Sequence, residues 1–506
     1  MQPDEAYRQL EERMKGLSLL GTTAGVLSWD QEVHMPPAGS AHRGEQLALL
    51  AGLAHERFAS RETGDLLTRA ADSPDLSLNP LDDRSVNLRE WRRSYDRARR
   101  LPKDLVEEMA RVTSQAQVEW VEACRNSDFA RFAPWLERIL SLVRREADAL
   151  GFATHPYDAL LEEYEPGLTT GELDSLFPPL ADELARILAS IKASAKKPDR
   201  SILSRRCPVA GQQALCRTLA ESLGFDFKRG RLDVSAHPFT TGLGPGDTRI
   251  TTRYDERDFG NSFFSTLHEV GHGLYDQGLP PEHHGTPRGE AVSLGIHESQ
   301  SRLWENFVGR SFPFWKWATP RLRGAFPGLF DDASPGTLFA AVNDVRPSLI
   351  RTEADEVTYN LHIILRFHLE KDLLSGRLAV PDLPAAWAET SERLFDIRPP
   401  DDARGCLQDV HWSHGSFGYF PTYTLGNLYA AQFMEAARKE IPDLDGLIGN
   451  GVFSPLLNWL RERIHSQGQR YRAGDLCLRV SGRPLDTRPF LAYLREKSSF
   501  LYGFPG

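Results

Sequence analysis

The stretch 263–278 reads FFSTLHEVGHGLYDQG and contains the pattern His268-Glu269-x-x-His272. Residues four apart on a helix are stacked neighbours, with Cβ atoms about 5–6 Å apart. Two imidazoles in this arrangement can converge on one Zn²⁺, and a glutamate beside the first can take a proton from the metal's water. The pattern therefore predicts a metal-binding helix in which Glu269 is the base.

The residues around the pattern favour a helix over 263–278. Asn261 and Ser262 are suitable N-cap residues, and an apolar stripe at helical spacing follows them. Gly278 is followed by two prolines, which is typical of a helix end. The segment is therefore long enough and regular enough to present both histidines on one face.

Small and acidic neighbours of the histidines suggest how the site is completed. Gly271 and Gly273 lower helix propensity, but they would let a second element approach the metal closely. Asp276 is one turn past His272, where a carboxylate can orient a metal-binding imidazole.

A catalytic zinc needs a third protein ligand and an open position for water. Glu298 is the best candidate, because a loop and a second helix over 290–310 could fold beside the first helix. Several other residues compete for this role: Glu290, Glu305 and the loop pair His283-His284. With the metal bound, Glu269 would take a proton from water, hydroxide would attack a polarised carbonyl, and Glu269 would return the proton to the leaving amine. Spacing alone thus indicates a zinc hydrolase and favours a peptidase.

Composition and charge exclude several other classes of protein. The chain has 506 residues, 41% of them hydrophobic, which is enough for a large core. A formal net charge of −10 argues against a nucleic-acid partner. The five cysteines are scattered without a CxxC pair, which predicts reduced thiols and a cytoplasmic location. We find no signal core and no apolar run of membrane-spanning length, so we expect no membrane partner.

The pattern of residues predicts a mainly α fold with a small β-sheet beside the metal-binding helix. The β-rich segments are 231–235 and 248–254, separated by a Gly/Pro turn. The helical segments are 6–20, 41–57, about 80–126, 129–150, 169–197, 337–374 and 383–395, with further helices from Thr424 and Pro455. We expect Pro178-Pro179 to kink or divide 169–197. No linker separates independent domains, so we predict one domain over 1–506.

The chain resembles the Taq-type metallocarboxypeptidase family over nearly its whole length. The resemblance rests on six ordered motifs: His237-Pro238-Phe239; Asp247-x-Arg249-x-Thr251; His268-Glu269-x-x-His272; His297-Glu298-Ser299-Gln300; Ile350-Arg351-x-x-Ala354-Asp355; and Gly405-x-x-Gln408-Asp409-x-His411-Trp412.

The resemblance implies removal of single residues from the C-terminus of peptides with broad specificity. It implies a helical fold with a deep groove, in which residues 1–200 cover the groove and 201–506 form the catalytic part, and it implies a homodimer. It assigns His268, His272 and Glu298 to zinc, for which cobalt can substitute, and Glu269 to catalysis.

An exopeptidase also needs a cation for the free carboxylate of its substrate, and an arginine fork suits this. The resemblance points to Arg351, with Arg249 and Arg253 as alternatives. The residues alone favour a helix-surface ion pair of Arg351 with Asp355, and only the resemblance favours carboxylate binding.

Four further residues are candidates for contacts with the substrate. His237 could donate to a substrate or satisfy a buried backbone group. Gln408 and His411 lie in the Gly- and aromatic-rich loop 405–421, and Tyr423 follows it. An imidazole or phenol from here could stabilise an oxyanion, or the rings could form a loop core.

Two other functions remain open from the sequence. A zinc endo- or oligopeptidase of related helical fold would use the same metal centre without recognising a free carboxylate. A non-catalytic helical scaffold with a vestigial metal site would not need Glu269.

Overall fold

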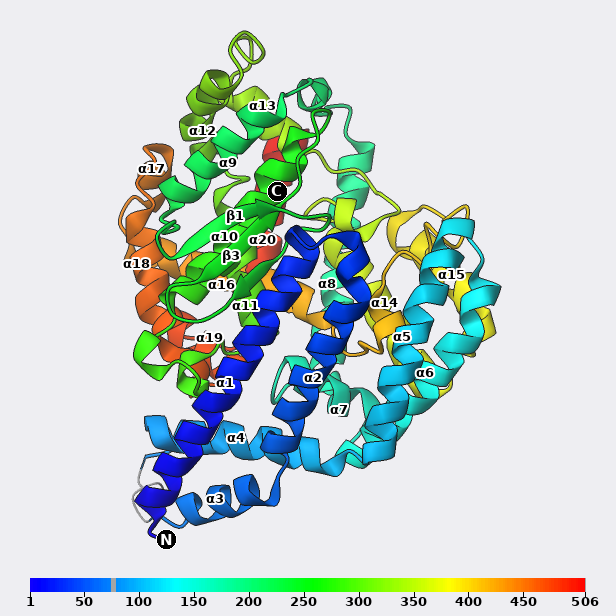
Figure 1. Cartoon of the computed structure of the whole chain (residues 1–506). Helices are drawn as coiled ribbons and strands as arrows, with labels where there is room; N and C mark the ends of the chain where they lie inside the picture. Colours follow the sequence, from blue (N-terminus) through cyan, green and yellow to red (C-terminus); the bar gives the residue numbers. More distant parts are fainter. Residues whose placement is uncertain (74–78, 506) are drawn as a thin grey trace. The chain divides into compact units, whose positions relative to one another are not determined.

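The computed structural model describes residues 1–73 and 79–505 (Figure 1). The chain divides into two compact units. The first unit comprises residues 1–98, 199–342 and 429–485, and the second comprises 99–198, 343–428 and 486–506. Each unit therefore draws on three separate segments of the chain. The predicted fold class, mainly helical with a small sheet, is confirmed; the single domain over 1–506 and its groove stay predictions.

The first unit contains most of the helices and all the described strands. Its helices are α1 (Pro3–Val33), α2 (Ser40–Phe58), α3 (Arg61–Ala71), α4 (Asp83–Arg100), α9 (Val209–Leu223), α10 (Phe259–Gly278), α11 (Leu294–Arg302), α12 (Phe312–Ala325), α13 (Pro335–Val342), α17 (Leu444–Gly449), α18 (Ser454–Arg463) and α19 (Ala473–Ser481). Two of the unit boundaries fall within helices, one in α4 and one in α16 (Pro421–Glu440).

Helix α1 is longer than the sequence pattern predicted. It continues past residue 20 to Val33 and ends just before Pro36-Pro37, the break that the sequence indicated. Only its N-terminal half has a regular buried face, where Ala6, Leu10 and Met14 pack with Leu67 and Trp91 of α3 and α4. Beyond that half the apolar pattern is weaker, which explains why the sequence predicted a shorter helix.

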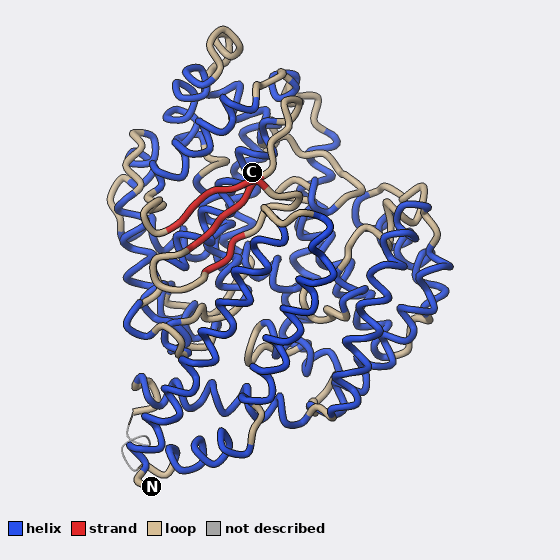
Figure 2. The backbone as a smooth tube through the Cα atoms, viewed as in Figure 1, coloured by secondary structure: helices blue, strands red, loops and turns tan. Residues whose placement is uncertain are grey.

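Three strands lie side by side in the first unit and form the sheet drawn in red in Figure 2. They are β1 (Gly230–Val234), β2 (Thr240–Gly242) and β3 (Thr248–Thr252), in the order β1-β3-β2. The central strand β3 is parallel to β1 and antiparallel to β2. The sequence predicted β1 and β3; it missed β2, which has only three residues.

The sheet packs on α10, the helix that carries the His-Glu-x-x-His pattern, because both present small or apolar groups. Gly273 of α10 lies against Phe225 and Ile250, and a Cβ there would be 2.7 Å from the Phe225 ring. On another face, Phe263 stacks on Trp315 of α12 with ring centroids 5.3 Å apart. Helix α10 is therefore fixed between the sheet and the aromatic core of the first unit.

The second unit is built from helices and loops. Its helices are α5 (Lys103–Asn126), α6 (Phe129–Leu150), α7 (Pro156–Tyr164), α8 (Thr170–Ala193), α14 (Tyr359–Ser375), α15 (Leu383–Phe395) and α20 (Arg488–Tyr502). The predicted bounds of α6 and α15 agree with the structure. Pro102 divides the predicted 80–126 pattern into α4 and α5, because proline favours the start of a helix over its interior.

Two other predictions for the second unit were wrong in detail. Helix α8 runs undivided across Pro178 and Pro179, with Phe177, Leu180 and Leu184 fully buried on one face. Tertiary packing of this kind outweighs the lost backbone hydrogen bonds. The predicted 337–374 helix is interrupted between α13 and α14, where Arg346-Pro347 disfavours helical backbone.

None of the helices within 1–73 and 79–505 has a stretch long and apolar enough to span a bilayer.

Candidate metal centre and its surroundings

Helix α10 begins earlier than the sequence suggested. The N-cap is Asp258, whose side chain accepts from the Asn261 backbone N–H; Asn261 and Ser262 lie inside the helix. The helix ends at Gly278 as predicted. Its predicted apolar stripe is buried, which leaves the opposite edge of α10 to carry the two histidines.

The second helix of the site approaches α10 at Gly271. A Cβ at this position would lie 2.6 Å from Cα of Ser301 and 2.7 Å from the carbonyl oxygen of Gln300. Only glycine permits so close a backbone contact, as the sequence suggested. Helix α11 is shorter than the predicted 290–310: Ser293 caps it, and it passes at Leu303 into a π-helical segment that ends at Val308.

This packing brings together the three side chains predicted as metal ligands. The nearer carboxylate oxygen of Glu298 lies 3.7 Å from Nε2 of His268 and 3.5 Å from Nε2 of His272. The three potential ligand atoms all lie within 4.8 Å of one another. Donors that share a tetrahedral Zn²⁺ are roughly 3.3–3.5 Å apart, given bonds of about 2.0–2.1 Å. Two imidazoles and a carboxylate at these separations fit a divalent metal ion.

A network of opposite charges holds Glu298 in place. Arg302 donates from Nε to the other oxygen of Glu298 at 2.6 Å. Burial alone would raise the pKa of the Glu298 carboxyl, but Arg302 and the facing imidazoles bring this pKa well below its usual range. The Glu298 side chain is therefore ionised, as a metal ligand must be.

Glu305 is the carboxylate that orients His268. Its oxygen lies 3.0 Å from Nδ1 of His268, and Arg302 and Arg310 bind the same side chain at 3.4 and 3.3 Å. The sequence proposed Glu305 only as a rival ligand. Its place in the π-helical segment explains the difference, since such segments often occur at functional sites and no local pattern announces them.

The proposed base, Glu269, is buried and hydrogen-bonded. The hydroxyl of Thr240 donates to its carboxylate at 2.6 Å and lies 3.0 Å from its carbonyl oxygen. Burial raises the pKa of the Glu269 carboxyl. Sequence reasoning missed Thr240, which lies on the unpredicted strand β2.

Asp276 does not orient His272. Its oxygen lies 3.1 Å from Nε2 of His297, so the carboxylate binds the histidine that precedes Glu298. His297 in turn stacks on His272, with ring centroids 4.4 Å apart and planes 17° apart. The other rivals for the third metal position are not in this group of ligand atoms: Glu290 lies in the loop before α11, and His283 faces Asp83 at 3.4 Å.

Two predicted substrate residues of the first unit have other contacts. Arg249 forms a two-point ion pair with Asp247 at 2.8 and 2.9 Å, and its guanidinium lies 4.2 Å above the Trp29 ring. His237 follows β1 in an exposed loop, where its carbonyl oxygen accepts from Ser235.

The second unit gathers the other predicted substrate residues around one carboxylate. Arg351 donates to Oδ1 of Asp409 from Nε and Nη2, at 3.0 and 2.8 Å. Arg366 donates to Oδ2 at 2.7 Å. The alternative ion pair of Arg351 with Asp355 is not formed, because Asp355 accepts backbone N–H groups at the start of α14.

Aromatic side chains surround this arginine pair. The Arg351 guanidinium lies 4.9 Å from the Tyr423 ring, and the His411 ring lies 6.4 Å from the same phenol. Burial lowers the pKa of His411 to about 4. Gln408 accepts from the backbone N–H of Arg351 at 2.9 Å, so it fixes the short 3₁₀ turn that carries the arginine.

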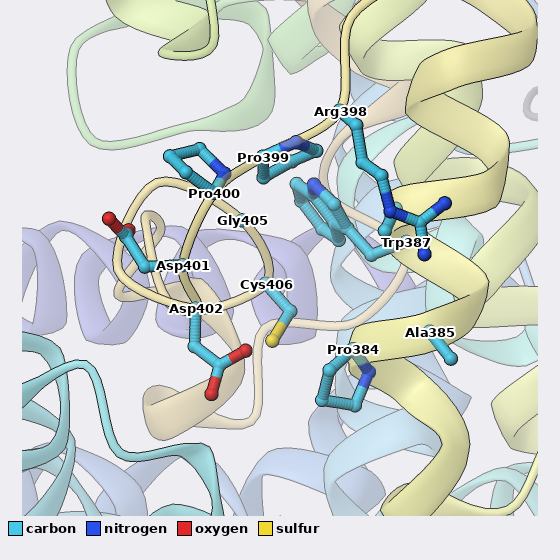
Figure 3. Close-up of a pocket in the computed structure, with 11 residues that line it drawn as sticks. Pro384, Ala385, Trp387, Arg398, Pro399, Pro400, Asp401, Asp402, Gly405 and Cys406 are labelled. Atoms are coloured by element: carbon cyan, nitrogen blue, oxygen red, sulfur yellow. The ribbon is translucent and has the colours of Figure 1, made fainter.

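The second unit also contains a pocket of about 250 Å³, shown in Figure 3. Pro384, Trp387, Pro399 and Pro400 contribute to its walls. Its lining includes one residue of the family motifs, Gly405, but none of the predicted metal-ligating, catalytic or substrate-binding residues, and Asp402 there accepts from the Phe129 backbone. This pocket therefore adds no chemistry to the predicted site.

A mainly helical fold with this cluster of two histidines, a carboxylate and a buried glutamate defines a helical metallopeptidase. Comparison with known proteins agrees: residues 9–498 match the carboxypeptidase Taq (M32) metallopeptidase family. The chain is 48% identical to thermostable carboxypeptidase 1 of Thermus thermophilus over 513 aligned positions, which cover 99% of this chain and 100% of that one. It is 37% identical to carboxypeptidase 1 of Bacillus subtilis, with 98% of each chain covered.

Solved structures show the same relationship. The M32 carboxypeptidase of Deinococcus radiodurans is 39% identical and superposes with a TM-score of 0.95, covering 99% of this chain and 100% of that one. The chain therefore belongs to the carboxypeptidase Taq (M32) metallopeptidase family. The predicted class of enzyme, a metallocarboxypeptidase, is confirmed with it.

Proposed function

We propose that this enzyme removes single residues from the C-terminus of peptides with broad specificity and depends on zinc, which cobalt can replace. The observation that carries the proposal is the convergence of His268, His272 and Glu298 beside the buried Glu269 in a chain of this family. Two imidazoles and one carboxylate form a ligand set typical of catalytic zinc.

The three proposed ligands would hold the ion, and the surrounding residues would keep them in position. When bound, a zinc ion supplies a Lewis acid that polarises a carbonyl and acidifies water. Arg302 keeps Glu298 ionised, and Glu305 fixes the ring of His268 through Nδ1. Such partners raise ligand basicity and set ring orientation.

Glu269 would act as general base and then as general acid. Its buried carboxylate is held by the Thr240 hydroxyl, so one oxygen has a fixed direction. A raised pKa brings a carboxyl closer to neutral pH, where it can both accept a proton and return it to the leaving amine. Glu269→Gln should retain the metal and lose nearly all turnover; a near-normal rate would remove this residue from the mechanism.

Arg351 would bind the free carboxylate of the substrate. Arg351 and Arg366 share the single carboxylate of Asp409, so a further anionic group would be favourable beside them. Tyr423 and His411 lie near the same guanidinium and could donate to an oxyanion. Gln408 would support the Arg351 turn, and His237 and Arg249 remain proposed as further substrate contacts.

A pair of peptides tests the exopeptidase proposal. One peptide has a free C-terminus and the other is amidated at the same residue. Mass spectrometry should show stepwise loss of single residues from the first and little cleavage of the second. Equal cleavage of both would instead favour an endo- or oligopeptidase. Bound metal without turnover on any peptide would favour a non-catalytic scaffold.

Arg351→Ala tests the carboxylate role separately. KM for free C-termini should rise far more than the dissociation constant for zinc, because the proposed metal ligands are unchanged. Equal losses in both would place Arg351 in support of the fold. Chelation should abolish cleavage, and added zinc or cobalt should restore it.

We also propose that the enzyme acts in the cytoplasm as a homodimer. All five cysteines are unpaired thiols, which supports a reducing compartment. The homodimer follows from the family resemblance, and light scattering on the purified protein tests it.

A further inference from the structure

The two metal-binding histidines are held in different ways. A histidine that binds a metal usually donates its second ring nitrogen to a carboxylate, a carbonyl or a water, which fixes the plane of the ring. His268 follows this rule through Glu305, 3.0 Å from Nδ1. Within residues 1–73 and 79–505, the buried Nδ1 of His272 has no hydrogen-bond partner.

A second ring takes the place of that hydrogen bond. The imidazole of His297 lies nearly parallel to that of His272, with centroids 4.4 Å and planes 17° apart. The imidazole of His268, the other histidine of the proposed metal site, is almost perpendicular to that of His272, with the ring planes 82° apart. A flat ring packed against one face limits rotation about the Cβ–Cγ bond even when no polar atom is engaged.

The position of His297 is itself determined by its neighbours. Asp276 lies 3.1 Å from Nε2 of His297 and fixes the ring through this nitrogen. Tyr275 packs near the same ring at 5.4 Å. A Cβ at Gly242 of β2 would lie 2.9 Å from the Asp276 carboxylate, so the strand leaves room only for hydrogen at that point.

We propose that His297 is a positioning residue that sets the plane of His272 by ring stacking, in place of a hydrogen bond to Nδ1. The inference rests on the proposed metal site. It assigns a physical role to the histidine that precedes Glu298, and it assigns Asp276 to His297 instead of to a metal ligand. When the stacked ring is absent, His272 would be held less firmly, and the metal would be lost more easily.

The test measures metal binding directly. The apo forms of the full-length protein and two variants, His297→Ala and His297→Phe, are titrated with Zn²⁺ in competition with a chromophoric chelator. Loss of a group that orients a metal ligand typically weakens metal affinity 10–100-fold. We expect that loss for His297→Ala and a value within about threefold of the unaltered protein for His297→Phe, because phenylalanine keeps the stacked ring.

The same proteins loaded with Co²⁺ give a second readout. The visible absorption of Co²⁺ reports the arrangement of its ligands. A general loss of stability would leave the spectrum of the folded fraction unchanged. His297→Ala should alter this spectrum and His297→Phe should preserve it. His42→Ala removes an exposed histidine of α2 and serves as the matched control, with no change in either measurement.

Different results overturn different claims. Unchanged affinity and spectrum in His297→Ala would overturn the positioning role while leaving the proposed metal site intact. Equal loss in His297→Ala and His297→Phe would overturn stacking as its cause, because both variants lose the contact with Asp276 and only His297→Phe keeps a stacked ring. Absence of metal binding by the unaltered protein would overturn the proposed function and this inference together.

Discussion

Asp409→Asn should destabilise the protein severely, because this carboxylate is shared by two buried arginines. Oδ1 accepts from Arg351 at 2.8 and 3.0 Å, and Oδ2 accepts from Arg366 at 2.7 Å. The Arg366 side chain is fully buried, with 0% of its surface exposed. Arg351 and Arg366 hold the pKa of Asp409 well below its usual range although burial opposes this. Asparagine is nearly isosteric, so the change removes the charge and leaves the volume.

The expected loss follows from the burial of both guanidiniums. Removing one partner of a buried ion pair costs about 3–5 kcal/mol, because the remaining charge is left uncompensated in the interior. Urea unfolding followed by circular dichroism measures the change. The control is Asp401→Asn in the same loop, whose partner Arg404 is 53% exposed. Surface pairs contribute about 0–1 kcal/mol, so the control should change little.

A double variant makes the reasoning refutable. Adding Arg366→Met to Asp409→Asn removes one of the two uncompensated charges while keeping an apolar chain beside Trp387, which the Arg366 guanidinium approaches to 4.7 Å. The double variant should therefore lose less stability than the sum of the two single changes. Strict additivity, or a loss for Asp409→Asn no larger than the control, would show that the arginines find compensation elsewhere.

Two further predictions concern a titrating core residue and the contact between the two helices of the metal site. Burial raises the pKa of Glu370 to about 7 from its ordinary 4.5, so the folded state binds this proton more tightly than the unfolded chain does. Its contribution to stability is present below pH 4.5 and is lost as the pH rises to about 7, by on the order of 3 kcal/mol. Glu370→Gln should flatten the stability curve over that range, and the exposed Glu392→Gln should not; an unchanged slope in Glu370→Gln would contradict the assignment. Gly271→Ala places a methyl against the backbone of α11 and should cost about 1–3 kcal/mol with weaker zinc binding. Gly44→Ala in α2 meets no atom within 4 Å and should be neutral or stabilising by up to about 1 kcal/mol, so equal unfolding midpoints for the two variants would argue against the close packing.

Much of the candidate metal site could be predicted because its information is local. His268, Glu269 and His272 lie within five residues, and helix geometry alone places the two histidines on one face. Glu298 was reached by spacing and by family resemblance. The short strand β2 and the start of α11 were missed, because three-residue strands and capping choices give weak sequence signals.

The sequence by itself determined the family, the helical class, the metal-binding pattern and the bounds of helices such as α6 and α15. These follow from residues near one another in the chain, whose spacing the helical period converts into a common face. Only the tertiary structure decided which group each site residue contacts: Glu305 for His268, His297 for His272, Thr240 for Glu269 and Asp409 for Arg351. Each of these contacts joins residues 25 or more positions apart, and their meeting depends on how whole helices and strands pack, which no local pattern specifies.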